Sequence, residues 1–291
     1  MLRGRPDVIG GDRALSTNPI SAQSVAASHT ITPSRLASGT AKADKVEGRA
    51  LRLLSLYGGV GHLAESFARR GGLSIVFDLD RHPENDLSKR KICGDIDGLV
   101  SVCDILGVDL PCCTWSRARR APPTSPFPSA VRSNQFLMGL PDLNDRDQAL
   151  IRRHNFMYRQ AIKWIRAHIA RGGSGYLENP LTSMLWKTRG VQRLLKITGV
   201  RLVDFNMCQY NTSWRKGKRM LVWGPWADHF PALKCTGTGG LCSRTHRPHV
   251  TLSGVADGRF RTSAAQVYPS ALTDKMATAF VKACSRCQCA C

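Results

Sequence analysis

The stretch LRLLSLYGGVGHLAESFARRGGLSIVFDLD, residues 51–80, decides the fold of this chain. Its first seven residues are rich in leucine, as expected of a buried strand, and three glycines follow directly after them. Residues 62–70 have the pattern of a helix that ends at a glycine pair, and residues 73–80 are a second apolar run that turns acidic. The order of strand, glycine loop, helix and strand predicts one unit of a parallel, doubly wound sheet.

The glycine loop predicts a cofactor site. Glycines after a strand let backbone N–H groups approach a bound molecule closely, and a carboxylate past the next strand can accept hydrogen bonds from ribose hydroxyls. Asp78 or Asp80 stands at about the twenty-residue separation expected of such a carboxylate. In the polar segment 81–99, Asp86 and Asp95 could reach the cofactor base, or serve as helix caps or solvated charges. Because the loop is not a complete G-x-G-x-x-G, a simple tight turn is the alternative. The expected cofactor contacts are Tyr57, Gly58, Gly59, Gly61, Asp78 and Asp95.

The stretch ILGVDLPCCTWSRARR, residues 105–120, carries the candidate nucleophile. An apolar run leads into Pro111 and Cys112, and catalytic groups of open α/β sheets gather past the carboxyl ends of strands. The arginines in the stretch 117–120 would favour the thiolate form of Cys112. We therefore expect Cys112 to be a nucleophile aimed at an anionic substrate, and Cys113 to be a packing residue. A buried strand-end thiol is the alternative for Cys112.

Two further polar groups follow predicted strands. After a long predicted helix at residues 144–171, a short strand leads into Glu178, which we expect on extended, non-regular backbone because a proline follows Asn179. A strand at residues 200–207 leads into a basic cluster ending at residue 219, and residues 220–223 predict a strand that returns from it. In a parallel sheet, Cys112, Glu178 and this cluster share one edge.

Together these elements predict an α/β fold with a doubly wound (Rossmann-like), mostly parallel sheet, an antiparallel pair near its end, and a small irregular Cys/His-containing C-terminal subdomain. Residues 1–49 lack apolar periodicity and are expected to form a disordered basic N-terminal arm, with a transit peptide as the alternative. Residues 50–223 form the expected catalytic core. Residues 224–283 form the Cys/His subdomain and a closing helix, and residues 284–291 form a cysteine-rich tail.

The charge of the chain points to its partner. The 291 residues include 42 Lys plus Arg against 21 Asp plus Glu, a formal net charge of +21. Such an excess is typical of proteins that bind a polyanion, and we expect nucleic acid, with DNA favoured and RNA as the alternative. No apolar run reaches the length of about eighteen residues that spans a membrane, so no membrane partner is expected.

The eleven cysteines indicate an intracellular, reducing compartment and a candidate metal site. Cys235, Cys242 and His249, joined by Cys208 or by His246, have the ligand types of a Cys₃His or Cys₂His₂ zinc site. Unpaired thiols in a surface subdomain are the alternative. The closely spaced cysteines of the tail are expected to be free.

The motifs resemble, in kind and order, those of the DNA (cytosine-5) methyltransferases. The resemblance is carried by LYGGVG at 56–61, LPCCTWS at 110–116, LENP at 177–180 and QYNTSWRKGKR at 209–219. It covers roughly residues 51–222, and RTSAAQVYP at 261–269 is similar to the family's late motif.

This resemblance implies S-adenosylmethionine-dependent methyl transfer to C5 of cytosine. Cys112 resembles the nucleophile that adds to C6 of a flipped cytosine, and Glu178 the glutamate that holds N3 and the exocyclic amine. Arg219 and Arg215 resemble the arginines that steady the base and the phosphate, and Asp78 and Asp95 would hold the ribose and adenine of the cofactor. The alternative is a non-catalytic nucleic-acid-binding protein on a methyltransferase scaffold, with or without zinc.

The chain departs from the family pattern at several positions. Ser55 stands where the family commonly has an acidic residue, Cys113 where it has glutamine, and Pro180 where it has valine. Asn211 and Ser213 stand where arginines are expected. These departures bear on cofactor affinity and substrate class more than on the fold.

Overall fold

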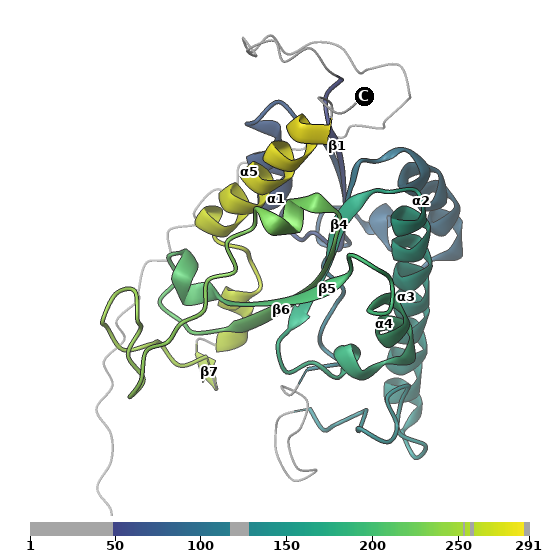
Figure 1. Ribbon diagram of the computed structural model, residues 1–291. Coiled ribbons are helices and arrows are strands. Elements are labelled where there is room, and N and C mark those ends of the chain that lie inside the picture. The colour runs from purple at the N-terminus through teal and green to yellow at the C-terminus, as the bar shows by residue number, and fades with distance from the viewer. Residues whose placement is uncertain (1–48, 117–127, 253, 257–258, 288–291) are drawn as a thin grey trace, which may run out of the picture. The chain divides into compact units, whose positions relative to one another are not determined.

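A six-stranded sheet forms the centre of the computed structural model, which describes residues 49–116, 128–252, 254–256 and 259–287 (Figure 1). The strands lie in the order β2-β1-β3-β4-β6-β5. They are β1 Arg52–Leu56, β2 Leu73–Phe77, β3 Ile105–Val108, β4 Ser174–Pro180, β5 Arg201–Asn206 and β6 Gly217–Trp223. The first four strands in this order pair in parallel, and β6 runs antiparallel to both of its neighbours. The predicted mostly parallel sheet, with an antiparallel pair near its end, is confirmed.

Helices cover both faces of the sheet (Figure 1). They are α1 His62–Ala68, α2 Arg90–Val102, α3 Asp145–Ala170, α4 Arg189–Leu194 and α5 Ser270–Cys287. Helices α1 and α5 share one apolar core with the sheet, and α2, α3 and α4 share the other. This layering is the doubly wound arrangement that the sequence predicts.

Short elements complete the described chain. They are the 3-10 helices Pro83–Asn85, Met184–Lys187, Met207–Tyr210, Pro225–Asp228 and Arg261–Ala265, and the strand pair β7 Val255–Ala256 and β8 Arg259–Phe260. None of the helices in the described ranges is both long enough and apolar enough to cross a bilayer. The predicted arm, apart from residue 49, and the last four residues of the tail lie outside the described residues.

Helix α3 forms where its sequence pattern places it. Asn144 caps its start, because the side-chain oxygen accepts a hydrogen bond of 2.9 Å from the backbone N–H of Asp147. Met157, Ala161 and Ile165 are buried at helical spacing against the sheet. Amphipathic spacing therefore predicts this helix correctly.

One helix was not predicted, and one local expectation is wrong. The polar segment 81–99 contains most of α2, whose buried side chains Cys93, Ile96 and Val100 recur at helical spacing. Glu178 does not lie on irregular backbone, because β4 continues to Pro180 and pairs Glu178 with Met220. The strand accepts the proline near its end because proline φ angles suit extended backbone.

Gly175 in β4 lies where no side chain fits. A Cβ at this position would stand 2.2 Å from the backbone oxygen of Leu106 and 2.5 Å from the Trp223 ring. We expect Gly175→Ala to lower the free energy of unfolding by about 1–3 kcal/mol through overpacking. Urea denaturation measures this loss. Gly94→Ala in α2 is the matched control, because a Cβ there meets nothing within 4 Å, and we expect unchanged or slightly raised stability.

Candidate active site

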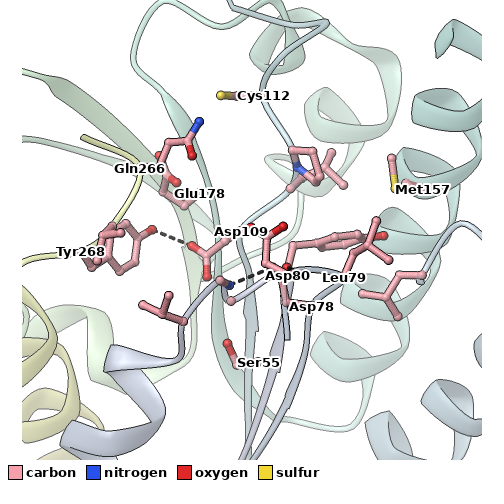
Figure 2. Close-up of a pocket in the computed structure, with 18 of the residues that line it drawn as sticks. Ser55, Asp78, Leu79, Asp80, Asp109, Cys112, Met157, Glu178, Gln266 and Tyr268 are labelled. Atoms are coloured by element: carbon pink, nitrogen blue, oxygen red, sulfur yellow. Dashed lines mark hydrogen bonds between the residues drawn. The ribbon is translucent and has the colours of Figure 1, made fainter. Parts of the chain in front are cut away.

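A pocket of about 450 Å³ opens past the carboxyl ends of β1 and β3 (Figure 2). From β1 the chain passes to β2 on one side, and β3 pairs with β1 on the other side. Ligands of open α/β sheets bind in the crevice at such a switch point. The glycine loop after β1, the residues after β3, the end of β4 and the segment Gln266 to Tyr268 line this pocket.

Cys112 and Glu178 meet in this pocket. Cys112 follows β3, is half-buried, and starts a turn in which the backbone N–H of Ser116 donates to the Cys112 oxygen at 2.9 Å. Glu178 lies near the end of the neighbouring strand β4 and is only 6% exposed. Both side chains line the pocket, as Figure 2 shows. The predicted thiol and carboxyl group therefore share one site although they are far apart along the chain.

A buried ion pair holds the Glu178 carboxylate. Its Oε1 atom lies 2.8 Å from Nζ of Lys218, and both side chains are less than one-tenth exposed. Lys218 lies on β6, opposite Pro180 of β4. Removing either partner of so deeply buried an ion pair leaves the other charge buried and unpaired, which destabilises the folded protein.

The described surroundings of Cys112 raise the pKa of its thiol above the ordinary cysteine value. Burial and the nearby Glu178 carboxylate raise its pKa, and the opposing charges of Lys218 and Lys216 do not outweigh them. The arginines of residues 117–120 lie outside the described residues. The expectation that these arginines favour the thiolate therefore concerns residues outside the described ranges.

Lys216 also lines the pocket. Its ammonium donates to the backbone oxygen of Ala265 at 2.8 Å. Burial, followed by repulsion from Lys218, lowers the pKa of Lys216 to about 8. This contact joins the start of β6 to the segment that carries the late motif.

Asp109 is a site residue that the sequence reasoning missed. It accepts a hydrogen bond from the hydroxyl of Tyr176 at 2.9 Å. It accepts another from the hydroxyl of Tyr268 at 2.5 Å, which Figure 2 shows. Removal from water and the Glu178 charge raise the pKa of Asp109 to about 7. Tyr268 belongs to the late motif, so Asp109 connects that motif to the end of β3. The sequence signal that could have identified Asp109 was its position directly after the predicted strand, three residues before Cys112.

The glycine loop forms the other end of the pocket. Gly59 donates its N–H to Asp78 Oδ2 at 2.8 Å, and the other Asp78 oxygen accepts from the N–H of Asp80 at 2.8 Å. Tyr57 has a φ of 59°, a strained backbone region for a bulky residue and one found often at functional sites. Its hydroxyl is buried without a hydrogen-bond partner among the described residues. Tyr57, Gly58, Gly59 and Asp78 all line the pocket, as do Asp80 and Asp86.

Two predicted cofactor residues lie elsewhere. Gly61 caps α1 in the left-handed conformation, with a φ of 87°, and is not part of the pocket lining. Asp95 is exposed on α2 and does not line the pocket either. Asp86 lines it instead and accepts a hydrogen bond of 3.1 Å from Arg153. Of the two carboxylates considered in the segment 81–99, the structure therefore brings Asp86 to the site.

Arg215 and Arg219 do not line the pocket. Arg219 donates from Nε and Nη2 to the Asp204 carboxylate at 2.6 and 2.8 Å, and Arg215 donates to the backbone oxygen of Cys235 at 2.9 Å. Alternate residues of a strand face opposite sides, so Lys218 reaches the pocket where Arg219 cannot. The sequence analysis began this strand at residue 220, whereas β6 begins at Gly217. With the earlier start, the alternation of Lys218 and Arg219 could have been predicted from the sequence.

The predicted metal residues come together away from the pocket lining. The ligand atoms of Cys208, Cys235, Cys242 and His249 all lie within 4.8 Å of one another. His246, the alternative ligand in the sequence, is not in this group.

Comparisons with known proteins give structural likenesses only. The chain matches no protein-family model and no curated protein. It is similar in structure to the S. pombe Dnmt2 methyltransferase, at 12% identity and a TM-score of 0.36 over 60% of this chain and 49% of that chain. It is similar at 11% identity and a TM-score of 0.36 to the Entamoeba histolytica methyltransferase EhMeth, over 64% of this chain and 57% of that one. The chain thus spans about half the length of these proteins, and likenesses of this size carry no conclusion about activity or substrate.

Proposed function

We propose that this protein transfers a methyl group from S-adenosylmethionine to C5 of cytosine in nucleic acid, with DNA favoured, through a covalent adduct at Cys112. One observation carries the proposal: Cys112 and Glu178 line the same pocket, beside a glycine loop held by Asp78. A protein that only binds nucleic acid has no need of a thiol and a buried carboxylate in one crevice.

The thiol supplies the chemistry that cytosine lacks. C5 of cytosine is a poor nucleophile, and addition of a thiolate to C6 divides one difficult step into two easier ones. In the proposed reaction the Cys112 thiol gives its proton to water and its sulfur bonds to C6, while electron density moves to C5. C5 takes the methyl group, and the bonding pair stays with the departing sulfur of the methyl donor. Water or hydroxide then removes the C5 proton, the electrons of that bond restore the ring double bond, and the carbon–sulfur bond breaks to return the thiolate.

In the proposal Glu178 holds the pyrimidine edge of the base. Its carboxylate is buried and lies in an ion pair with Lys218. In the proposed complex one oxygen of this carboxyl group accepts a hydrogen bond from the exocyclic amine, and the other shares a proton with N3, which takes that proton as the sulfur adds to C6. A base inside a duplex cannot reach such a pocket, so it must be extruded at a cost of roughly a few kcal/mol. The net charge of +21 favours the phosphate contacts that offset this cost.

The glycine-loop end of the pocket suits S-adenosylmethionine. Asp78, Asp80 and Asp86 line it and offer carboxylates to ribose hydroxyls, an exocyclic amine and a positively charged sulfonium. The Tyr57 hydroxyl, which has no hydrogen-bond partner in the described part of the chain, offers a polar contact inside the same space. When bound there, the molecule supplies the methyl group, and these residues bind and orient it.

Asp78→Ala tests this assignment. We expect the variant to bind S-adenosylmethionine about 10- to 100-fold more weakly, because the loop loses the acceptor for Gly59 and the ribose loses its carboxylate. Isothermal titration calorimetry measures the affinity. Asp95→Ala is the control and should bind as the unmodified protein does, since Asp95 is exposed and outside the pocket lining. Equal loss in both variants would contradict the assignment.

The proposed activity is tested with radiolabelled S-adenosylmethionine and matched DNA and RNA oligonucleotides that contain cytosine. Transfer to C5 of one of them supports the proposal and identifies the substrate class. A folded protein that binds both oligonucleotides with the usual salt dependence but transfers no label would leave the non-catalytic nucleic-acid-binding alternative.

A further inference from the structure

We propose that Cys208, Cys235, Cys242 and His249 bind one zinc ion in a tetrahedral site. This ion stabilises the loop between residues 235 and 249. The site is separate from the methyl-transfer pocket, so the inference does not rest on the proposed function.

The spacing of the four ligand atoms suits zinc. All four lie within 4.8 Å of one another, and Cys235 Sγ lies 3.7 Å from His249 Nε2. Tetrahedral zinc with Zn–S bonds of about 2.3 Å and Zn–N bonds of about 2.0 Å places its ligands roughly 3.5–3.8 Å apart. The cluster therefore needs to contract by no more than about 1 Å to hold the ion.

The histidine is held in the orientation that metal ligands require. His249 Nδ1 lies 2.8 Å from the backbone oxygen of Gly240, an acceptor only, so Nδ1 carries the proton. Nε2 then has its lone pair free and faces Cys235. An outer hydrogen bond that fixes the tautomer in this way is the usual arrangement around a ligating imidazole.

Hydrogen-bond donors face the three sulfurs. The backbone N–H of Ser243 points to Cys235 Sγ at 3.4 Å, and Gln209 Nε2 lies 3.6 Å from Cys208 Sγ and 3.8 Å from Cys242 Sγ. Such donors stabilise thiolates. Three thiolates this close repel one another unless a cation lies between them, and a divalent ion supplies that charge.

The surrounding loop has little else to hold it. Cys208, Cys235 and Cys242 are each at most 3% exposed and form a buried cluster of their own, separate from the two main cores among the described residues. Between residues 235 and 249 the structure describes one isolated bridge, Leu241 with Pro248, and no named helix or strand. A metal ion commonly replaces the apolar core that so short an irregular segment cannot build.

The cluster also supports the turn that leads into β6. Arg215 donates to the Cys235 oxygen at 2.9 Å, and the N–H of Val250 donates to the Ser213 oxygen at 2.9 Å. Met207, beside the ligand Cys208, donates its N–H to the Lys216 oxygen at 3.0 Å. Through these contacts a bound ion would steady the chain just before Lys218 enters the pocket.

Elemental analysis of the full chain, purified without added metal or chelator, tests the proposal. We expect one zinc per chain, and loss of most of it in Cys242→Ser and His249→Ala. Cys93→Ser is the matched control, because Cys93 is also a buried free cysteine but lies on α2, and it should retain the zinc.

Two further measurements keep the test decisive if a ligand variant fails to fold. Unmodified protein stripped of metal and titrated with Co²⁺ should show the intense visible absorption of a tetrahedral thiolate site. A folded protein with neither zinc nor such a spectrum would overturn the proposal, as would a disulfide among the three cysteines found by mass spectrometry of the protein as purified. Neither measurement depends on methyl transfer, so failure of the zinc site and failure of the proposed activity are distinguishable.

Discussion

Cys112→Ser is expected to reduce methyl transfer to cytosine by at least about 10³-fold, because a hydroxyl cannot replace the thiolate that adds to C6. Label transfer from S-adenosylmethionine to the better oligonucleotide measures the loss. The exchange is nearly isosteric, so we expect the free energy of unfolding to change by less than about 1 kcal/mol. Because burial and Glu178 raise the pKa of the Cys112 thiol, the rate of the unmodified protein should rise with pH while the fold persists.

Cys113→Ser is the control for this variant. Cys113 is adjacent in the chain and also lines the pocket, but it is exposed and its sulfur lies 3.4 Å from His154 Nε2. We expect Cys113→Ser to retain most of the transfer activity. Activity that survives in Cys112→Ser and disappears in Cys113→Ser would show that Cys113, and not Cys112, is the nucleophile.

Lys218→Met is expected to lower the free energy of unfolding by about 3–5 kcal/mol, because it leaves the Glu178 carboxylate buried without its partner. Urea denaturation at neutral pH measures the effect. The double variant Lys218→Met with Glu178→Gln should recover much of this stability, since no buried charge then remains unpaired.

Lys163→Met provides the surface comparison. Lys163 pairs with Asp97 at 2.6 Å, but the two side chains are 58% and 42% exposed, and such pairs contribute at most about 1 kcal/mol. A loss in Lys218→Met no larger than that in Lys163→Met would show that the Glu178 charge is not held by the ion pair.

Strong periodic signals made the central fold predictable. The leucine-rich run before the glycine loop and the apolar stripe of α3 are local patterns. Such patterns predict secondary structure without knowledge of tertiary contacts. Helix α2 was missed because its exposed positions are mostly polar or glycine, so the three buried residues in its sequence do not form an obvious run. The sequence of such a helix resembles that of a loop, because its few apolar residues have a clear role only when they pack beside α3.

Cys112, Glu178 and Asp78 of the pocket were predictable from the sequence, but Asp109 and the two lysines Lys216 and Lys218 were not. Cys112 follows β3 and Glu178 lies near the end of β4, and the parallel pairing of these two strands brings both residues to one edge of the sheet. The partner of Glu178 depends on the register between β4 and β6, which places Lys218 opposite Pro180. Register is a tertiary property, so residue type alone pointed to the neighbouring arginines.

The fourth ligand of the metal cluster also depended on the folded backbone. The sequence allowed either Cys208 or His246 beside Cys235, Cys242 and His249, and the structure brings Cys208. In the structure His246 has a φ of 55° and its N–H closes a turn onto the Cys242 oxygen, while His249 Nε2 faces Cys235. A left-handed turn residue cannot be recognised from spacing.

The central claim is that the Cys112 sulfur bonds to cytosine, and mass spectrometry of the complex with a 5-fluorocytosine oligonucleotide tests it most directly. Fluorine at C5 cannot leave as a proton does, so the adduct formed after methyl transfer should persist. We predict a species with the mass of protein plus methylated oligonucleotide, its cross-link located at Cys112 and absent from Cys112→Ser. Folded protein that binds both S-adenosylmethionine and the oligonucleotide yet forms no such species, or forms it at another residue, would contradict the account.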